Sequence, residues 1–104
     1  MNKPMASNIS TSLIISTYNR SDALEICVKS VLRQSLLPDE IIIADDGSKE
    51  DTRELIHQLA ASSEVPIIHV WHEDLGFRLA SIRNKAIAKA SKEYIIQIDG
   101  DIVL

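Results

Sequence analysis

The sequence predicts an α/β domain in which a mainly parallel β-sheet carries helices on both faces, in three layers. Two observations predict this class. Short runs rich in β-branched residues alternate along the chain with longer stretches whose apolar residues recur at helical spacing. The run 41–44 is continuously apolar, which is typical of a strand that crossover helices cover on both sides. The expected order of elements is therefore βαβαβαβ.

The first strand and the helix behind it are predicted from a change of hydrophobic period. Residues 13–17 combine apolar and β-branched side chains and end at the polar stretch 18–20. Asp22 is expected to cap the following helix, which ends near Gln34, before Pro38. Apolar residues three and four positions apart form one stripe on this helix, so the stripe, including the single Cys, is expected in the core. Its members are Leu24, Cys27, Val28, Val31 and Leu32.

The remaining elements repeat this alternation. Ser48 or Asp51 is expected to cap the second helix. Residues 1–12 are polar and are expected to be a disordered lead-in, so the domain is expected to cover residues 13–104. The predicted strands are 13–17, 40–44, 66–71 and 94–98, the second helix ends at 62–63, and the third runs from Leu79 to about Ala90.

Composition excludes several classes of function. The 104 residues are 45% hydrophobic and 25% charged, as in an ordinary soluble globular domain. Eleven Lys and Arg against 15 Asp and Glu give a net charge of -4 without a basic stripe, which disfavours nucleic acid as a partner. One Cys forms no internal disulfide, and no apolar run approaches the roughly 20 residues that span a bilayer. We therefore expect a cytoplasmic protein, with any membrane association supplied by segments outside this sequence.

Polar residues follow the first, second and fourth predicted strands, at 17–20, 45–48 and 99–101. Short connections with right-handed crossovers bring the carboxyl ends of parallel strands to one edge of the sheet. Such sheets bind ligands at that edge. The sequence therefore predicts a binding site formed by these three segments.

Asp99 and Asp101 flank Gly100 at the end of the fourth strand. Glycine permits a sharp turn that directs both carboxylates the same way, and clustered carboxylates bind Mg²⁺ or Mn²⁺ together with water and phosphate oxygens. Asp-Gly pairs are also common in turns, so the tripeptide alone is equally compatible with a turn leading into a hairpin.

Asp45 and Asp46 allow two similar interpretations. One of them caps the following helix or forms a turn with Gly47, or a carboxylate at the strand end accepts the imide N–H of a uracil or binds a ribose hydroxyl. Neither G-x-G-x-x-G nor G-x-x-x-x-G-K-[ST] is present, which argues against a dinucleotide fold and a P-loop.

The other candidate side chains are less specific. Arg78 and Arg83 do not share a helix face, so one of them could reach the predicted site and offset diphosphate charge, although a solvated Arg is the simpler reading. Trp71 is expected to pack in the protein, whereas Tyr18, at a strand exit, is the candidate for stacking on a nucleotide. No spacing typical of zinc ligands relates the three histidines, which are expected to be structural or exposed: His57, His69 and His72.

Four motifs in order resemble the nucleotide-sugar half of family 2 glycosyltransferases. They are STYNR at 16–20, ADDGS at 44–48, RNKA at 83–86 and IDGD at 98–101, within a likeness that covers 13–103. The resemblance implies the GT-A fold, a Rossmann-like three-layer arrangement, here truncated. It also implies a metal-dependent enzyme that transfers a sugar, with inversion, from a nucleotide diphosphate sugar to an acceptor hydroxyl. A UDP-sugar is the expected donor.

The resemblance assigns the base-binding part of the donor site. Thr17 and Tyr18 would lie against the base, and Asn19 and Arg20 belong to the same nucleotide-sugar-binding motif. Asp45 would accept a hydrogen bond from uracil.

The resemblance also assigns the part of the site that binds the diphosphate and the metal. Asp46 would support the loop that carries Asp45, and either Arg78 or Arg83 would approach the base or the diphosphate. Asp99 would contact ribose or the sugar and, with Asp101, coordinate a Mn²⁺ or Mg²⁺ that bridges the two phosphates. A metal there neutralises charge that develops on the leaving diphosphate.

In this family the general base and the surface for the acceptor saccharide or lipid follow the DxD motif. The sequence ends at Leu104, so we expect a fragment that holds the donor and metal site, binds nucleotide weakly and has no turnover alone. An unpaired edge on the fourth strand would favour self-association.

Three alternatives remain. The tail 95–104 also resembles the strand-then-DxD opening of haloacid-dehalogenase-type phosphatases, in which Asp99 would be the nucleophile and Asp101 the general acid. Those enzymes usually carry the motif on their first strand. A phosphoreceiver domain needs a Lys after a later strand, which this sequence lacks. In a noncatalytic module the Asp motifs would be turns, and nucleotides would not bind with or without metal.

Overall fold

The structure is a computed structural model that describes residues 10–74, 76 and 78–100. Over these residues, parallel strands form one sheet in the order β3-β2-β1-β4. The strands are β1 (Thr11–Thr17), β2 (Glu40–Asp45), β3 (Ile67–Trp71) and β4 (Tyr94–Asp99). The helices are α1 (Ser21–Leu32), α2 (Glu50–Ser62) and α3 (Leu79–Lys89). The predicted alternation is confirmed, and no helix within the described ranges is long and apolar enough to cross a membrane.

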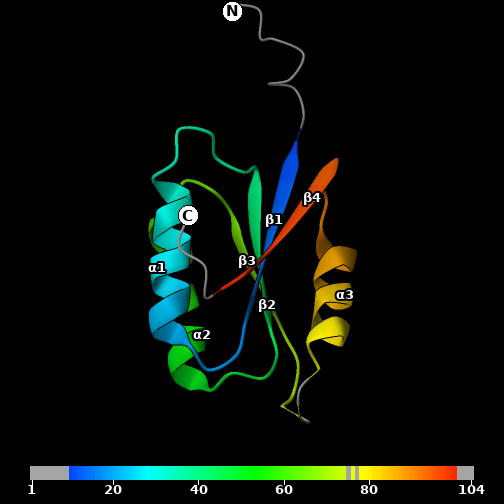
Figure 1. The fold of residues 1–104 in the computed structure, drawn as a ribbon. Helices are drawn as coiled ribbons and strands as arrows, with labels where there is room; N and C mark the ends of the chain where they lie inside the picture. The colour runs from blue at the N-terminus through cyan, green and yellow to red at the C-terminus, as the bar shows by residue number, and fades with distance from the viewer. Residues whose placement is uncertain (1–9, 75, 77, 101–104) are drawn as a thin grey trace, which may run out of the picture.

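The helices cover both faces of the sheet. Figure 1 shows α1 and α2 on one side and α3 on the other. Alternate residues of the central strands supply the two cores, because side chains along a strand point to opposite faces. Ile15 and Ile43 pack with α1 and α2, where Cys27 is fully buried as predicted, and Ile14 and Ile42 pack with α3.

The carboxyl ends of the strands lie level with one another. Thr17 in β1 is paired with Asp45 in β2, which is paired with Trp71 in β3, and Ser16 is paired with Asp99 in β4. The loops that follow β1, β2 and β3 lie at the same end of the sheet (Figure 1). The sheet therefore collects the polar residues at one edge, as predicted, while Asp101 lies outside the described residues.

The predicted cap of α1 is wrong. The chain enters α1 through Asn19, whose φ of 48° lies in the left-handed region, so the helix starts at Ser21 with Arg20 at the N-cap position. Asp22 therefore lies inside the first turn. There the backbone N–H of Ala23 donates to its carboxylate and lowers the pKa of Asp22, a favourable place for a negative charge at a helix start.

The predicted caps of α2 are wrong for a different reason. Lys49 occupies the N-cap position and makes no side-chain cap. The Ser48 hydroxyl instead accepts the backbone N–H of Asn19 at 2.7 Å, and Asp51 lies in the first turn. The Ser48 hydroxyl, which the sequence predicted to cap α2, therefore connects the loop after β1 to the loop after β2.

A buried carboxylate lies at the opposite end of the sheet. β1 begins at Thr11, two residues before the predicted start, and this places Ser12 opposite Glu40. Ser12 Oγ donates to Glu40 at 2.6 Å, and the backbone N–H and Oγ of Ser91 donate at 2.9 and 3.0 Å. Burial disfavours the charged form, but these hydrogen bonds outweigh it, so the pKa of Glu40 lies below its ordinary value of 4.5.

The two outer strands of the described sheet carry exposed apolar side chains. Trp71, the last residue of β3, is 52% exposed, so the prediction that it packs inside the protein is wrong. Tyr94, Ile95 and Ile96 of β4 are also exposed. Both strands lie at an edge, where fewer elements are available to cover them.

Replacing Ile43 by Ala should lower the free energy of unfolding by about 2 to 5 kcal/mol, because the fully buried side chain leaves a cavity between the sheet and its helices. The matched change Ile26→Ala, on the exposed side of α1, should stay within about 0.5 kcal/mol. Urea denaturation followed by circular dichroism measures both, and equal losses would contradict this core.

Glu40→Gln should weaken the acid dependence of stability. A carboxyl group whose pKa is lowered in the folded state contributes stability above its unfolded pKa, and this contribution is lost as the pH falls through the folded pKa. The unmodified protein should therefore lose thermal stability steeply below about pH 4.5, and Glu40→Gln should lose less over the same range. Exposed Glu54→Gln is the control, and a profile for Glu40→Gln that matches it would contradict the role of Glu40.

Candidate functional site

A pocket of about 170 Å³ lies at the carboxyl ends of β1 and β4, beside the start of α3. It receives residues from the end of β1 and the loop behind it, from the loop after β2, from the start of α3 and from the last residue of β4. Its lining residues are Ser16, Thr17, Tyr18, Arg20, Asp46, Leu79 and Asp99. The structure thus brings together five side chains predicted for the donor site, from three segments that are distant in sequence: Thr17, Tyr18, Arg20, Asp46 and Asp99.

Other predicted residues do not line this pocket. Asn19 joins the loops after β1 and β2, because its side-chain oxygen accepts the Lys49 N–H at 2.9 Å. Arg78 stands at the start of α3 with its guanidinium 3.4 Å from Ser81 Oγ, and Arg83 lies further along the same helix.

Asp45 is fully buried and is used inside the protein. One carboxylate oxygen accepts the Ser48 N–H at 2.9 Å, and the other lies 2.8 Å from His69 Nε2. The carboxylate therefore closes the turn after β2 and ties it to β3. It fulfils the turn role that the sequence analysis left open.

Asp46 is also almost fully buried, yet it lines the pocket. Its Oδ1 lies 2.5 Å from His72 Nε2, and its Oδ2 accepts the Arg78 N–H at 2.8 Å. The other ring nitrogen of His72, Nδ1, lies 3.0 Å from Lys85 Nζ. A Lys ammonium only donates, so Nδ1 accepts, the proton resides on Nε2, and the neutral ring donates to Asp46.

The histidine partners of the two aspartates were not predicted from the sequence. His69 and His72 were expected to be structural or exposed, and both have a structural role, because each contacts a buried carboxylate at the end of β2. A polar His inside the apolar strand 67–71, next to a strand ending in two carboxylates, is the signal that points to such pairs.

Tyr18 forms the outer wall of the site. It is exposed, and its hydroxyl donates to Asp74 at 2.8 Å. This hydrogen bond raises the pKa of the Tyr18 phenol, so the ring remains neutral. Tyr18 and Asp46 also line a smaller hollow of about 100 Å³ with Asp74 and Gly76.

Two glycines allow close backbone approaches around the pocket. Gly47 has φ +87°, and a Cβ on it would lie 2.5 Å from the Asp74 Cα. A Cβ on Gly100 would lie 2.6 Å from the Ser16 carbonyl oxygen, to which the Gly100 N–H donates at 2.8 Å. Glycine at 100 therefore lets the chain close against β1 directly after Asp99.

The donor set suits a metal that a bound ligand helps to hold. Within the described part of the chain, no group of three or more His, Cys, Asp or Glu side chains could enclose an ion. Asp99 offers a hard oxygen ligand at the exposed end of β4. Mg²⁺ and similar ions are commonly held by one or two carboxylates together with water and phosphate oxygens, so this arrangement fits such an ion.

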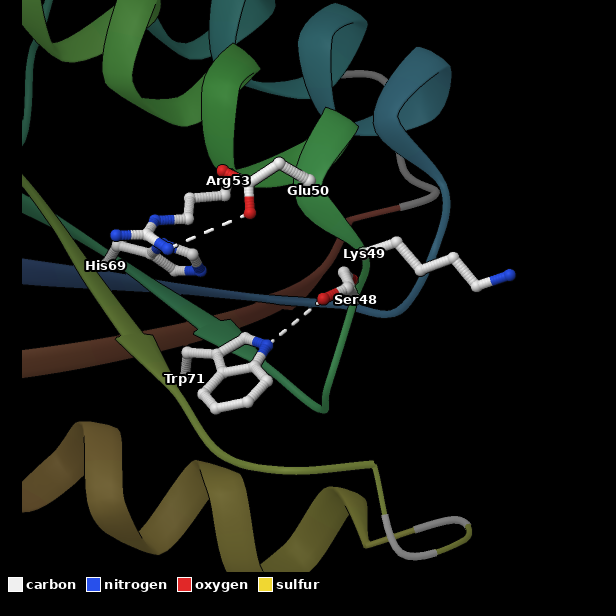
Figure 2. A pocket seen from close by; sticks show the side chains of 6 residues that line it. All are labelled: Ser48, Lys49, Glu50, Arg53, His69 and Trp71. Atoms are coloured by element: carbon white, nitrogen blue, oxygen red, sulfur yellow. Dashed lines mark hydrogen bonds and ion pairs between the residues drawn. The ribbon is translucent and has the colours of Figure 1, made fainter.

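A second, larger pocket of about 470 Å³ lies between α2 and β3. Figure 2 shows its six lining side chains: Ser48, Lys49, Glu50, Arg53, His69 and Trp71. None of them lines the pocket at the ends of β1 and β4. The loop after β2 separates the two pockets, because Asp46 belongs to one and Ser48 to the other.

Solved structures define the fold. S. aureus TarS, residues 1–349, matches with a TM-score of 0.73 and 21% identity over 91% of this chain and 28% of that one. Glucosyl-3-phosphoglycerate synthase from Mycobacterium tuberculosis, in complex with Mn²⁺, UDP and glucosyl-3-phosphoglycerate, matches with a TM-score of 0.69 and 19% identity over 99% and 40% of the two chains. The fold is that of GT-A glycosyltransferases.

Sequence comparison then defines the family. The family model described as Glycosyl transferase family 2 matches residues 12–104. Chondroitin synthase of Pasteurella multocida strain Pm70 is 33% identical over 101 residues, which are 96% of this chain and 10% of that protein. The chain belongs to glycosyltransferase family 2, a family of transferase enzymes, and it spans about a tenth of this relative. The predicted family is confirmed. Because the family model covers residues 12–104, the phosphatase and phosphoreceiver alternatives are excluded.

Removing His72 should destabilise the site through Asp46. His72→Ala leaves a nearly buried carboxylate without one of its donors, so the free energy of unfolding should fall by about 1 to 3 kcal/mol, with partial recovery in His72→Gln. His57→Ala, an exposed change on α2, is the control. Long-range ¹H–¹⁵N NMR should also show the proton of His72 on Nε2 at neutral pH. A proton on Nδ1 would contradict the Lys85–His72–Asp46 arrangement.

Proposed function

We propose that this chain is the donor-binding part of an inverting glycosyltransferase that transfers a sugar from a UDP-sugar to an acceptor hydroxyl. The pocket that combines Thr17, Tyr18, Asp46 and Asp99 at the ends of parallel strands carries the proposal. Family membership supports it, as do crystal structures of S. aureus TarS in complex with UDP and with UDP-GlcNAc, which share the fold at a TM-score of 0.70.

Burial favours Asp46 over Asp45 as the acceptor for the imide N–H of uracil. Asp45 has no exposed surface, and both of its oxygens have partners inside the protein. Asp46 lines the pocket, and because each carboxylate oxygen has two lone pairs, the donors His72 and Arg78 leave it capacity for another hydrogen bond. Uracil presents an N–H at the ring position where cytosine presents an unprotonated nitrogen, so such a site prefers UDP over CDP.

Asp99 and Asp101 are proposed to hold Mn²⁺ or Mg²⁺ beside the diphosphate. When bound, the ion neutralises charge on the departing diphosphate. Arg20 lines the same pocket as Asp99, so we assign its guanidinium to the phosphates in preference to Arg78 and Arg83. Inversion places the acceptor hydroxyl on the side of the sugar opposite the diphosphate, with a general base on residues beyond Asp101 in the whole protein.

The partners proposed for the whole protein are a nucleotide diphosphate sugar and an acceptor saccharide or lipid. The exposed edge of β4, with Tyr94, Ile95 and Ile96, also supports self-association as part of this proposal.

Calorimetric titration with UDP in the presence and absence of Mn²⁺ tests the donor site. Binding should depend on the metal, and Asp99→Asn should remove that dependence. Asp46→Asn should weaken UDP binding by about 10- to 100-fold, the usual worth of a hydrogen bond to a charged group. Glu54→Gln, an exposed change in α2, should have no effect.

The same titration with CDP distinguishes recognition of the base from binding of the diphosphate. CDP should bind more weakly than UDP to the unmodified protein, and the difference should shrink in Asp46→Asn. Equal binding of UDP and CDP by the unmodified protein would contradict the role of Asp46, and no binding of either nucleotide to folded protein would contradict the donor site itself.

A further inference from the structure

We infer that the pocket between α2 and β3 is a second binding site, which takes the pyranose rings of a neutral oligosaccharide against the indole of Trp71. The inference rests on the proposed function, because a glycan is the acceptor or product class of a sugar transferase. The volume of about 470 Å³ is within the range of ligand-binding cavities. The site shares no lining residue with the donor pocket.

Trp71 provides a fixed apolar surface. Its Nε1–H donates to the Ser48 carbonyl oxygen at 3.1 Å, which anchors the edge of the ring to the loop after β2, yet the side chain remains half exposed (Figure 2). Because the indole N–H is already used, the ring offers its face rather than a donor. The axial C–H groups of a pyranose pack on such a face and leave the hydroxyls at the rim.

The rim of the pocket offers a hydrogen-bond donor and an acceptor next to each other. The guanidinium of Arg53 lies 3.8 Å from the carboxylate of Glu50, and both side chains are exposed on the first turns of α2 (Figure 2). Neighbouring hydroxyls on a sugar each donate and accept, so an adjacent guanidinium and carboxylate match them. An ion pair this exposed contributes little to stability, which leaves both groups available for a ligand.

The backbone at the start of α2 argues against a phosphate as the ligand. The N–H groups of Ser48 and Lys49, the two residues before α2, already donate to Asp45 Oδ1 and Asn19 Oδ1. The carboxylate of Glu50 lies 3.8 Å from the guanidinium of Arg53 and offsets its charge, and the ammonium of Lys49 points away from Trp71 and His69 (Figure 2). A neutral ligand rich in hydroxyl groups is therefore favoured over a nucleotide.

The site lies behind the donor loop. Ser48 and His69 line it, and both bind the carboxylate of Asp45, whose neighbour Asp46 lines the donor pocket. A glycan held at Trp71 would therefore contact the same loop as the donor from its other side.

Trp71 is the single Trp of the chain, so tryptophan fluorescence reports on this pocket alone. Cellotetraose and chitotetraose, whose rings carry equatorial substituents, are the probes. Each should give a saturable change in emission with a Kd of about 1 mM or tighter, as expected for a small stacked ligand. Arg53→Ala and Glu50→Gln should each weaken binding at least threefold, while the matched control Arg33→Ala, at the end of α1, should not.

Calorimetry of Trp71→Ala completes the test. This variant should lose tetrasaccharide binding, retain its circular dichroism spectrum and bind UDP as the unmodified protein does. UDP binding without a saturable response to either tetrasaccharide would overturn the second site alone. Saccharide binding without UDP binding would support it while contradicting the donor site. Emission that changes with protein concentration, with association seen by light scattering and no response to saccharide, would make this face an interface between copies and overturn the inference.

Discussion

Two buried carboxylates, at the carboxyl end of β2 and directly after it, determine how this end of the sheet is assembled. Charge that is removed from water must be matched by donors nearby, and Asp45 and Asp46 obtain theirs from several elements. His69 and His72 reach them from β3 and the loop behind it, and Arg78 donates from the start of α3. The loops that form the pocket at the ends of β1 and β4 are therefore positioned by the requirement to pair these two charges.

The layers of the fold could be predicted because they depend on a repeated local pattern. The alternation of strand and helix periods places α1, α2 and α3 correctly, with boundaries shifted by one or two residues. The helix caps could not be predicted, because the Ser48 hydroxyl binds Asn19, a partner 29 positions away. Tertiary contacts of this kind override the preference of a Ser or Asp for the nearest helix start.

The proposed donor site was only partly predictable for the same reason. The sequence places Thr17, Tyr18, Asp46 and Asp99 at strand ends, and the structure gathers them around one pocket. It does not reveal which of two adjacent aspartates faces a ligand, since that depends on partners such as His69, 24 positions from Asp45. Trp71 is exposed because β3 is an outer strand of the described sheet. The order of the strands could not be predicted from any single segment of the sequence.

The contacts of Asp46 also constrain how such a protein can evolve. A neutral apolar side chain at position 46 would orphan both the His72 N–H and the Arg78 N–H, at a cost of about 1 to 3 kcal/mol each. Under the proposed function, a lineage that shifts its nucleotide preference through position 46 would therefore need compensating substitutions at positions 72 and 85, introduced in an order that keeps the chain folded. Epistasis among these positions, more than the shape of the pocket, would make the base preference slow to change.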